Sequence, residues 1–249
     1  MSETRRQKRE NKRSRVTLKK LTFHQLDWLE YLTIFWAIWF FIFPHPYKIL
    51  FGVLIAIPVV GLLLNGINGK PSIASLGKYE KDKHGNDEYD VADFIDVAAW
   101  IILVRVLIDF EFESFFSIII IGTIASVLVI IILLLTHKMI ERSQKDRLWI
   151  YFSIIGSIMV YCYAGAYGVN CVFDNSIAKV YQTPVLDKHI YHGKHTSYHL
   201  IIAPWGHHYD KEDITVSQEQ YEKTNPGQLV KVDVKDGLLG IPWYYVEEQ

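Results

Sequence analysis

Residues 115–136 read FFSIIIIGTIASVLVIIILLLT, and this stretch contains no charged side chain. A helix needs about 20 mostly apolar residues to cross the hydrocarbon core of a bilayer. Residues 115–136 therefore predict a transmembrane helix. The composition agrees, because hydrophobic residues make up 50% of the 249-residue chain, at the upper end of the range for soluble domains.

Four further apolar stretches have a comparable length, at residues 27–43, 47–64, 91–110 and 148–169. The first two are separated by the sequence PHPY, whose prolines predict the end of one helix and a tight turn into the next. The sequence thus predicts a membrane α-helical bundle of about five transmembrane helices within residues 27–172.

Lys and Arg are concentrated in three segments outside the apolar stretches. Residues 1–26 form a basic arm, and the loops GKYEKDKHGNDEYD and HKMIERSQKDR are also rich in Lys. Basic clusters can bind nucleic acid, but beside membrane spans they more often mark the cytoplasmic side. We expect a multi-pass protein of the inner (plasma) membrane with a cytoplasmic N-terminus, in contact with lipid and not with nucleic acid.

The tail, residues 173–249, has a different pattern, because hydrophobic residues alternate there and turn signals recur. Val230, Val232 and Val234 lie on one face of a predicted strand, and Asp236-Gly237 predicts the turn that follows. The tail therefore predicts a small all-β C-terminal domain of four to six strands, a barrel or a sandwich. With five spans before it, this domain is extracytoplasmic.

Two segments of the tail carry a resemblance to known proteins. The sequence LIIAPWG, followed by VSQEQYEKTNPGQLVKVDVKDGLLGIPWY, resembles the C-terminal part of uncharacterised bacterial multi-span inner-membrane proteins that end in a small β domain. The resemblance covers about the last third of the chain. It implies a bacterial inner-membrane setting and assigns no activity.

The third apolar stretch contains the intramembrane charged residues Asp93, Asp96, Arg105 and Asp109. A charge at the centre of a bilayer costs about 2.5–3.5 kcal/mol on insertion scales, so such groups face protein or water. Arg105 and Asp109 are one helical turn apart and can pair. The pattern favours a structural role in holding helices or subunits together over an ion or proton path.

Small residues four positions apart predict close helix packing in the fourth and fifth stretches. These pairs are Gly122 and Ser126, Ser153 and Ser157, and Ala164 and Gly168. They also point to a homo-oligomer or to a partner protein of the membrane or envelope.

Histidines cluster in the tail between residues 189 and 208. A hairpin with a three-residue loop at 192–194 places Asp187 opposite His199 and His189 opposite Ser197. Asp187, His189 and His199 are then a candidate metal or pH-sensing group, because imidazole and carboxylate suit Zn or Cu. Their spacing matches no standard metal motif, so the alternative is a solvated face, and no cofactor is expected.

A candidate interaction surface comprises Trp205, His207 and His208 in APWGHHYD, together with Trp243. Both tryptophans could instead belong to the core. The chain has no nucleophile elbow, HExxH helix, phosphate-binding loop or dinucleotide motif, so we expect no enzyme.

The leading functional prediction is a non-enzymatic integral membrane protein that presents an extracytoplasmic β domain for protein interaction or envelope sensing. An immunity or defence component, or a subunit of a complex, would have the same layout. The alternative is an oligomeric channel or transport subunit with the charged third stretch near its path. A metal-dependent envelope enzyme is a third reading.

Overall fold

The computed structural model describes residues 28–67, 69–81, 87–112, 116–142, 147–193, 196–206 and 208–246. The predicted basic arm, residues 1–26, lies outside these ranges. The chain divides into two compact units. The helical unit comprises Met1–Val106 and Ile118–Gly168, and the β unit comprises Leu107–Ser117 and Val169–Gln249.

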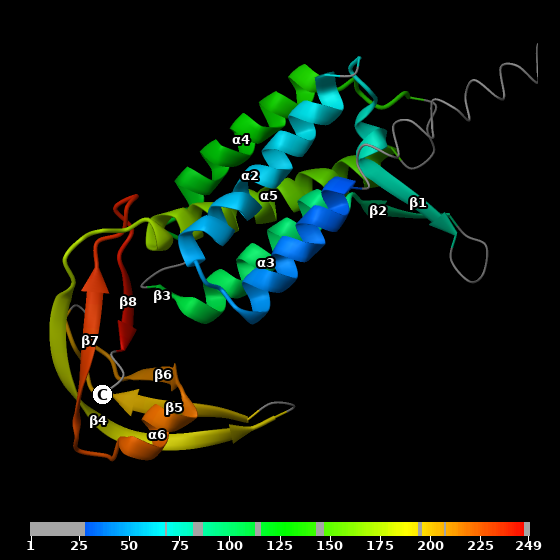
Figure 1. Ribbon diagram of the computed structural model, residues 1–249. Coiled ribbons are helices and arrows are strands. Elements are labelled where there is room, and N and C mark those ends of the chain that lie inside the picture. Colours follow the sequence, from blue (N-terminus) through cyan, green and yellow to red (C-terminus); the bar gives the residue numbers. More distant parts are fainter. Residues whose placement is uncertain are drawn as a thin grey trace, which may run out of the picture. The chain divides into compact units, whose positions relative to one another are not determined.

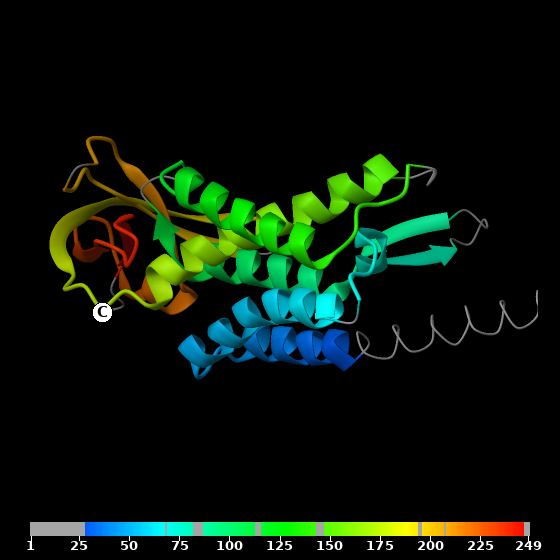
Figure 2. The same ribbon diagram turned by 90° about the horizontal axis from the view of Figure 1, so that it is seen from above.

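Helices dominate the helical unit and lie side by side in Figures 1 and 2. The described helices are Trp28–Ile42, α2 (Tyr47–Ile67), α3 (Asp93–Asp109), α4 (Ile119–Thr136) and α5 (Arg147–Val172), the last residues of α3 and α5 belonging to the β unit. The predicted break at PHPY is confirmed, because one helix ends at Ile42 and the next begins at Tyr47.

In the described part of the chain, three helices are long and apolar enough to cross a membrane, namely α2, α4 and α5. The prediction of five such spans is therefore wrong by this criterion. Helix Trp28–Ile42 is a shorter apolar helix, and α3 has 17 residues. At 1.5 Å per residue these two helices are about 22 and 26 Å long, and α4, the shortest of the three candidate spans, is about 27 Å long, against a hydrocarbon core of about 30 Å. The apolar stretches at residues 27–43 and 91–110 extend beyond the ends of these helices.

The expected loop GKYEKDKHGNDEYD contains secondary structure. After the short 3-10 helix η1 (Ile73–Leu76), strand β1 (Gly77–Lys81) pairs with β2 (Asp87–Val91) in an antiparallel hairpin. The register runs from Gly77 opposite Val91 to Lys81 opposite Asp87. The sequence did not predict this hairpin, because its residues are mostly charged and show no alternation of apolar side chains that would indicate a buried face.

Small residues on α4 and α5 allow the helices to pack closely, as predicted. A Cβ atom added at Gly122 would lie 2.7 Å from the ring of Tyr163 on α5. A Cβ atom at Gly168 would clash with the ring of Phe51 on α2. Neighbouring helices of the same chain thus occupy the faces of these two glycines.

The β unit contains a nearly closed antiparallel sheet of six strands in the order β3-β8-β7-β4-β5-β6. The strands are β3 (Glu111–Phe112), β4 (Lys179–His192), β5 (Thr196–Ile202), β6 (Glu212–Val216), β7 (Leu229–Lys235) and β8 (Trp243–Val246), with helix α6 (Gln218–Lys223) between β6 and β7. The predicted β domain is confirmed in its main feature. Strand β3 comes from the segment between α3 and α4, for which no strand was predicted.

Strand β4 is shared by the two halves of the sheet, and it is the long curved strand in Figure 1. Its first residues pair with β7, from Lys179 opposite Val234 to Pro184 opposite Leu229. Its later residues pair with β5, ending with His192 opposite Thr196. The curvature of β4 wraps the sheet around one hydrophobic core.

The core of the β unit is formed by side chains from five strands and the loop after β5. It includes Val185, Leu200, Ile202, Trp205, Ile214, Val230, Val232, Val234 and Tyr244. The predicted inward face of β7, with its three valines, is confirmed.

Candidate functional site

The register of β4 and β5 differs from the predicted register. His189 lies opposite His199, and Asp187 lies opposite Ile201. The predicted pairing of Asp187 with His199 is therefore wrong. The pairing continues to His192 and Thr196, which places the connection one residue later than the predicted loop at 192–194. Residues 194 and 195 lie outside the described part of the chain. A loop moved by one residue shifts every cross-strand partner by two.

The observed register stacks the two imidazoles against each other on the outer face of the sheet. The ring centroids of His189 and His199 are 5.0 Å apart, with an interplanar angle of 16°. Asp213 of the neighbouring strand β6 completes the group. Its Oδ1 lies 2.9 Å from Nδ1 of His199, and its Oδ2 lies 3.6 Å from Nε2 of His189.

We call His189, His199 and Asp213 the His-Asp cluster. Their potential ligand atoms all lie within 4.8 Å of one another, and among the described residues this is the group with the composition to hold a metal ion. Sequence analysis missed Asp213, because it is contributed by a third strand. The alternation in β6 was the available signal, since Ile214 points into the core and its neighbours point outward.

A second group of polar side chains surrounds the carboxylate of Glu212, the first residue of β6. Trp205 Nε1 donates to Oε2 at 2.9 Å, and the hydroxyl of Tyr244 donates to Oε1 at 2.8 Å. His208 Nδ1 lies 3.4 Å from Oε1. Strands β6 and β8, which carry Glu212 and Tyr244, are not neighbours in the sheet. The carboxylate therefore links two strands across the gap in the nearly closed sheet.

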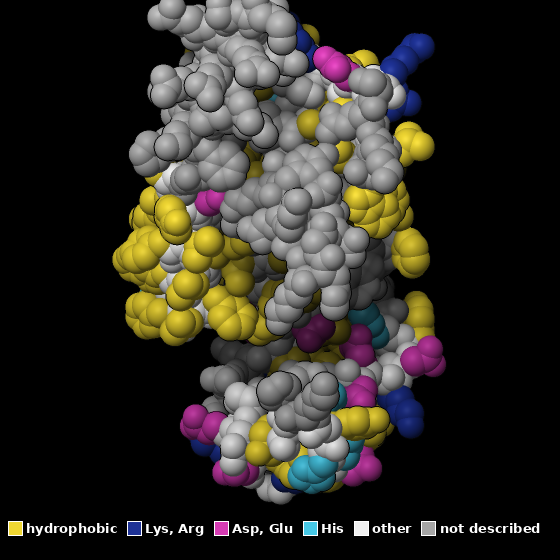
Figure 3. All heavy atoms as spheres, turned by 90° about the vertical axis from the view of Figure 1, so that its right-hand side faces the viewer, with side chains coloured by type: hydrophobic (Ala, Val, Ile, Leu, Met, Phe, Trp, Pro, Cys, Tyr) yellow, Lys and Arg dark blue, Asp and Glu magenta, His cyan; other side chains and the backbone are white. Residues whose placement is uncertain are grey.

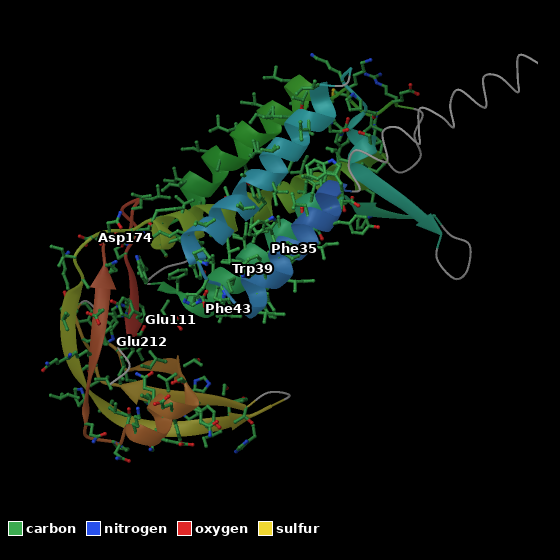
Figure 4. The ribbon with its side chains drawn as sticks, in the orientation of Figure 1. Phe35, Trp39, Phe43, Glu111, Asp174 and Glu212 are labelled. Atoms are coloured by element: carbon green, nitrogen blue, oxygen red, sulfur yellow. The ribbon has the colours of Figure 1, made fainter. Side chains whose placement is uncertain are left out.

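Glu111 of β3 lies near Glu212 (Figure 4). The surrounding protein removes part of the water around the Glu111 carboxyl, and the negative charge of Glu212 repels it. Both effects raise the pKa of Glu111 above its ordinary value of 4.5. The ionised forms of Glu111 and Glu212 thus disfavour each other at the edge of the sheet.

Trp205 and Trp243 do not form an exposed surface. They are only 5% and 7% exposed, so the interaction surface predicted from these two side chains is wrong and the core alternative holds. His208 stacks on Trp205 with a centroid distance of 4.2 Å. His207 lies outside the described residues.

A buried carboxylate, Asp174, fastens the loop between β7 and β8. Its oxygens accept hydrogen bonds from Ser176, from the backbone N–H of Gly237 and from Trp243 Nε1, the last at 2.9 Å. Burial alone would raise the pKa of Asp174, but these hydrogen bonds outweigh that effect and lower the pKa below 3.8. Sequence analysis did not single out Asp174.

Asn170, near the end of α5, holds the same loop. Its side chain is fully buried, with Nδ2 donating to the carbonyl of Ile241 at 2.8 Å and Oδ1 accepting from the N–H of Leu239 at 2.9 Å. Gly237 has a positive φ of 77°, and a Cβ atom there would clash with the Ile241 carbonyl. This loop is consequently fixed by polar contacts and not by apolar packing alone.

The predicted charged residues of the third apolar stretch all lie on α3. Asp93 is its first residue, and its side chain is outside the described part of the chain. Oδ1 of Asp96 accepts a hydrogen bond of 3.0 Å from Ser157 on α5. Arg105 and Asp109 are partly buried, and their mutual ion pair stays a prediction.

Helix Trp28–Ile42 and the residues after it present an aromatic row, labelled in Figure 4 by Phe35, Trp39 and Phe43. All three side chains are exposed. Trp36 stacks on Trp39 with a centroid distance of 5.5 Å. The row is a preformed apolar surface on a helix that is short for a membrane span.

No family model matches the chain, and comparisons with curated proteins and with solved structures find no match either.

Proposed function

We propose that this chain is a non-enzymatic integral membrane protein whose helical unit is the anchor and whose β unit is the extracytoplasmic part that contacts a protein partner or senses envelope conditions. The distribution of side chains on α4 carries the membrane part of this proposal. The β unit, with its polar outer clusters, supports the second part.

Helix α4 buries a narrow stripe that begins with two small residues, and it leaves most of its large apolar side chains exposed. The buried positions are Gly122, Ser126, Val129 and Leu133, which form one stripe. On the outside, Ile120 is 72% exposed and Leu128 is 57% exposed. In water this would leave an apolar surface larger than soluble monomers tolerate. In lipid the same surface is solvated, and small residues provide the helix contacts.

The ends of the helices support an orientation. Gly66 of α2 packs against Thr136 of α4, so the C-terminal ends of these two helices meet. The segments at this end carry Lys70, Lys138, Arg142 and Arg147. Cytoplasmic segments of membrane proteins are enriched in Lys and Arg, so we assign this end to the cytoplasm. Figure 3 shows Lys and Arg side chains at one end of the helices and hydrophobic side chains along them.

The exposed aromatic row fits the same picture. Aromatic side chains prefer the boundary between hydrocarbon and water. A helix of the length of Trp28–Ile42, with Phe35 and Trp39 exposed, can lie at this boundary or extend to it without a full crossing.

The alternative function, an oligomeric channel or transport subunit, places the charges of α3 beside a path. The hydrogen bond from Ser157 to Asp96 gives that carboxylate a role in helix packing instead. Reconstituted protein should accordingly give no current above background in liposomes. A selective current that Asp96→Asn diminishes would favour the channel.

Cysteine labelling in intact cells tests the anchor and its orientation. Cys162 and Cys171 are both buried, so the background should be low. We expect Lys211→Cys to react with a membrane-impermeant maleimide from outside, and Arg142→Cys to react only after permeabilisation. Ser117→Cys, which follows α3, should react from outside if α3 crosses with the other helices.

Extraction is the companion measurement. The chain should stay in the membrane pellet at alkaline pH and leave it only in detergent. Release into the alkaline supernatant would overturn the anchor, and protection of Lys211→Cys from the external reagent would overturn the orientation alone.

A further inference from the structure

We propose that the His-Asp cluster is a mononuclear binding site for a zinc-like divalent cation on the outer face of the sheet. The site would be formed by His189 Nε2 of β4, His199 Nδ1 of β5 and a carboxylate oxygen of Asp213 of β6. This inference does not depend on the proposed membrane function, because it rests on the β unit alone.

The spacing of the ligand atoms supports a tetrahedral ion. Zinc bonds to His nitrogen and carboxylate oxygen are about 2.0–2.2 Å long, which places neighbouring ligand atoms of a tetrahedron about 3.3 Å apart. His199 Nδ1 lies 2.9 Å from Oδ1 of Asp213, and His189 Nε2 lies 3.6 Å from Oδ2, the other oxygen of the same carboxylate. The potential ligand atoms lie within 4.8 Å of one another, so side-chain rotations that draw the two imidazoles toward one carboxylate oxygen would receive the ion.

The orientation of His199 supports the same assignment. Its Nε2 lies 2.9 Å from the hydroxyl of Ser197, two residues away on the same strand face. Without an ion, Nδ1–H donates to the Asp213 carboxylate, which can only accept. When an ion binds, the ring proton is on Nε2, which donates to the Ser197 hydroxyl, and the lone pair of Nδ1 is directed at the ion. A hydrogen bond from the second ring nitrogen is the usual way in which proteins orient a metal-binding imidazole.

Three protein ligands leave one tetrahedral position open. The side chain of His199 is only 20% exposed, whereas that of Asp213 is 52% exposed. Water can therefore take the fourth position on the exposed side. Two imidazoles and one carboxylate suit zinc and its neighbours in the transition series, whereas magnesium and calcium prefer oxygen ligands alone.

The strand arrangement gives such an ion a structural consequence. The cluster draws one ligand from each of three adjacent strands, β4, β5 and β6. A bound ion would connect these strands through their side chains, in addition to the backbone hydrogen bonds. Metal binding should consequently stabilise the folded arrangement of β4, β5 and β6, because the ion binds the folded state and not the unfolded chain.

Titration calorimetry of the full chain in detergent is the test. The protein is purified without a polyhistidine tag, treated with a chelator and titrated with zinc chloride near pH 7.5. We expect one zinc per chain with a dissociation constant on the order of micromolar. His199→Ala and the nearly isosteric Asp213→Asn should each weaken binding at least about tenfold, whereas magnesium should not compete.

Two matched variants serve as controls. His192→Ala removes an exposed histidine on the opposite face of β4, and Asp187→Asn removes the carboxylate that the observed register places opposite Ile201. Both should bind zinc within about twofold of the unmodified chain. Circular dichroism of each variant confirms that the sheet is intact.

Cobalt gives a second readout that does not depend on heat signals. A tetrahedral cobalt site absorbs visible light far more intensely than an octahedral one, and this absorption should be lost in Asp213→Asn. No saturable zinc binding, binding that Asp213→Asn retains, or binding that Asp187→Asn weakens equally would each overturn the site.

Discussion

Helix α4 and strand β7 distribute their side chains in opposite ways. Along α4 the buried stripe begins with Gly122 and Ser126, and most of the surrounding surface is Ile, Leu and Val. Along β7 the three valines are buried and Lys231 is exposed. The comparison teaches that the two units of this chain are packed in different ways. The β unit gains stability by removing apolar surface from water, whereas α4 contacts its neighbours partly through small residues that allow a close approach.

The buried carboxylate of Asp174 is an exception to this contrast, because the core of the β unit is otherwise mostly apolar. Removing this carboxylate should have the largest effect on stability. Asp174→Ala leaves the buried Nε1 of Trp243 and the N–H of Gly237 without their acceptor. We expect a loss of about 4 kcal/mol in the free energy of unfolding of the β unit, measured by near-ultraviolet circular dichroism in denaturant.

Asp236→Ala is the matched control, because Asp236 is exposed and its side chain pairs with the exposed Lys179 at 2.8 Å. Its loss should be far smaller than that of Asp174→Ala, because solvent screens an exposed ion pair. Equal losses in the two variants would show that the buried network around Asp174 is not what fixes the loop between β7 and β8.

A charge on the outer face of α4 should have the next largest effect. Leu128→Asp places a carboxylate on the apolar surface, which costs about 2.5–3.5 kcal/mol if that surface faces lipid. We expect a much smaller amount of protein in the membrane fraction, measured by immunoblot after fractionation. Lys231→Asp on the exposed side of β7 should leave that amount unchanged. A Leu128→Asp protein that inserts normally would contradict the contrast between the two surfaces.

The smallest expected effect concerns the acidic pair at the edge of the sheet. Because the pKa of Glu111 is raised, its contribution to stability is present below about pH 4.5 and is lost as the pH rises through the folded-state pKa. Glu111→Gln should therefore raise the melting temperature slightly at pH 7, on the order of 1 °C, and have no effect at pH 4. A gain that is independent of pH would exclude repulsion from Glu212 as its cause.

The sequence predicted the positions of the helices well, because long apolar stretches and the break at PHPY are strong local signals. The number of full spans was overestimated, because apolar residues continue past the end of helix Trp28–Ile42. The valine alternation of β7 was sufficient to predict its buried face. Each of these features depends on neighbours in the sequence.

The missed features depend on residues that are distant in the sequence. The His-Asp cluster required the exact position of a loop and the register of a third strand, and neither is specified by the composition around His199. Asp174 has its partners in the loop after β7, and no local pattern distinguishes it from a surface aspartate. The contacts of Glu212 with Trp205 and Tyr244 likewise appear only when the sheet curves.

The two-residue strand β3 affects the order in which the protein can be completed during synthesis. Glu111 and Phe112 pair with Tyr244 and Trp243, so about 130 residues of chain separate the partners. Strand β8 must therefore have left the ribosome before it can pair with β7 and with β3. Until β8 is synthesised, β3 has no strand to pair with. A chain truncated before residue 243 therefore cannot complete this sheet.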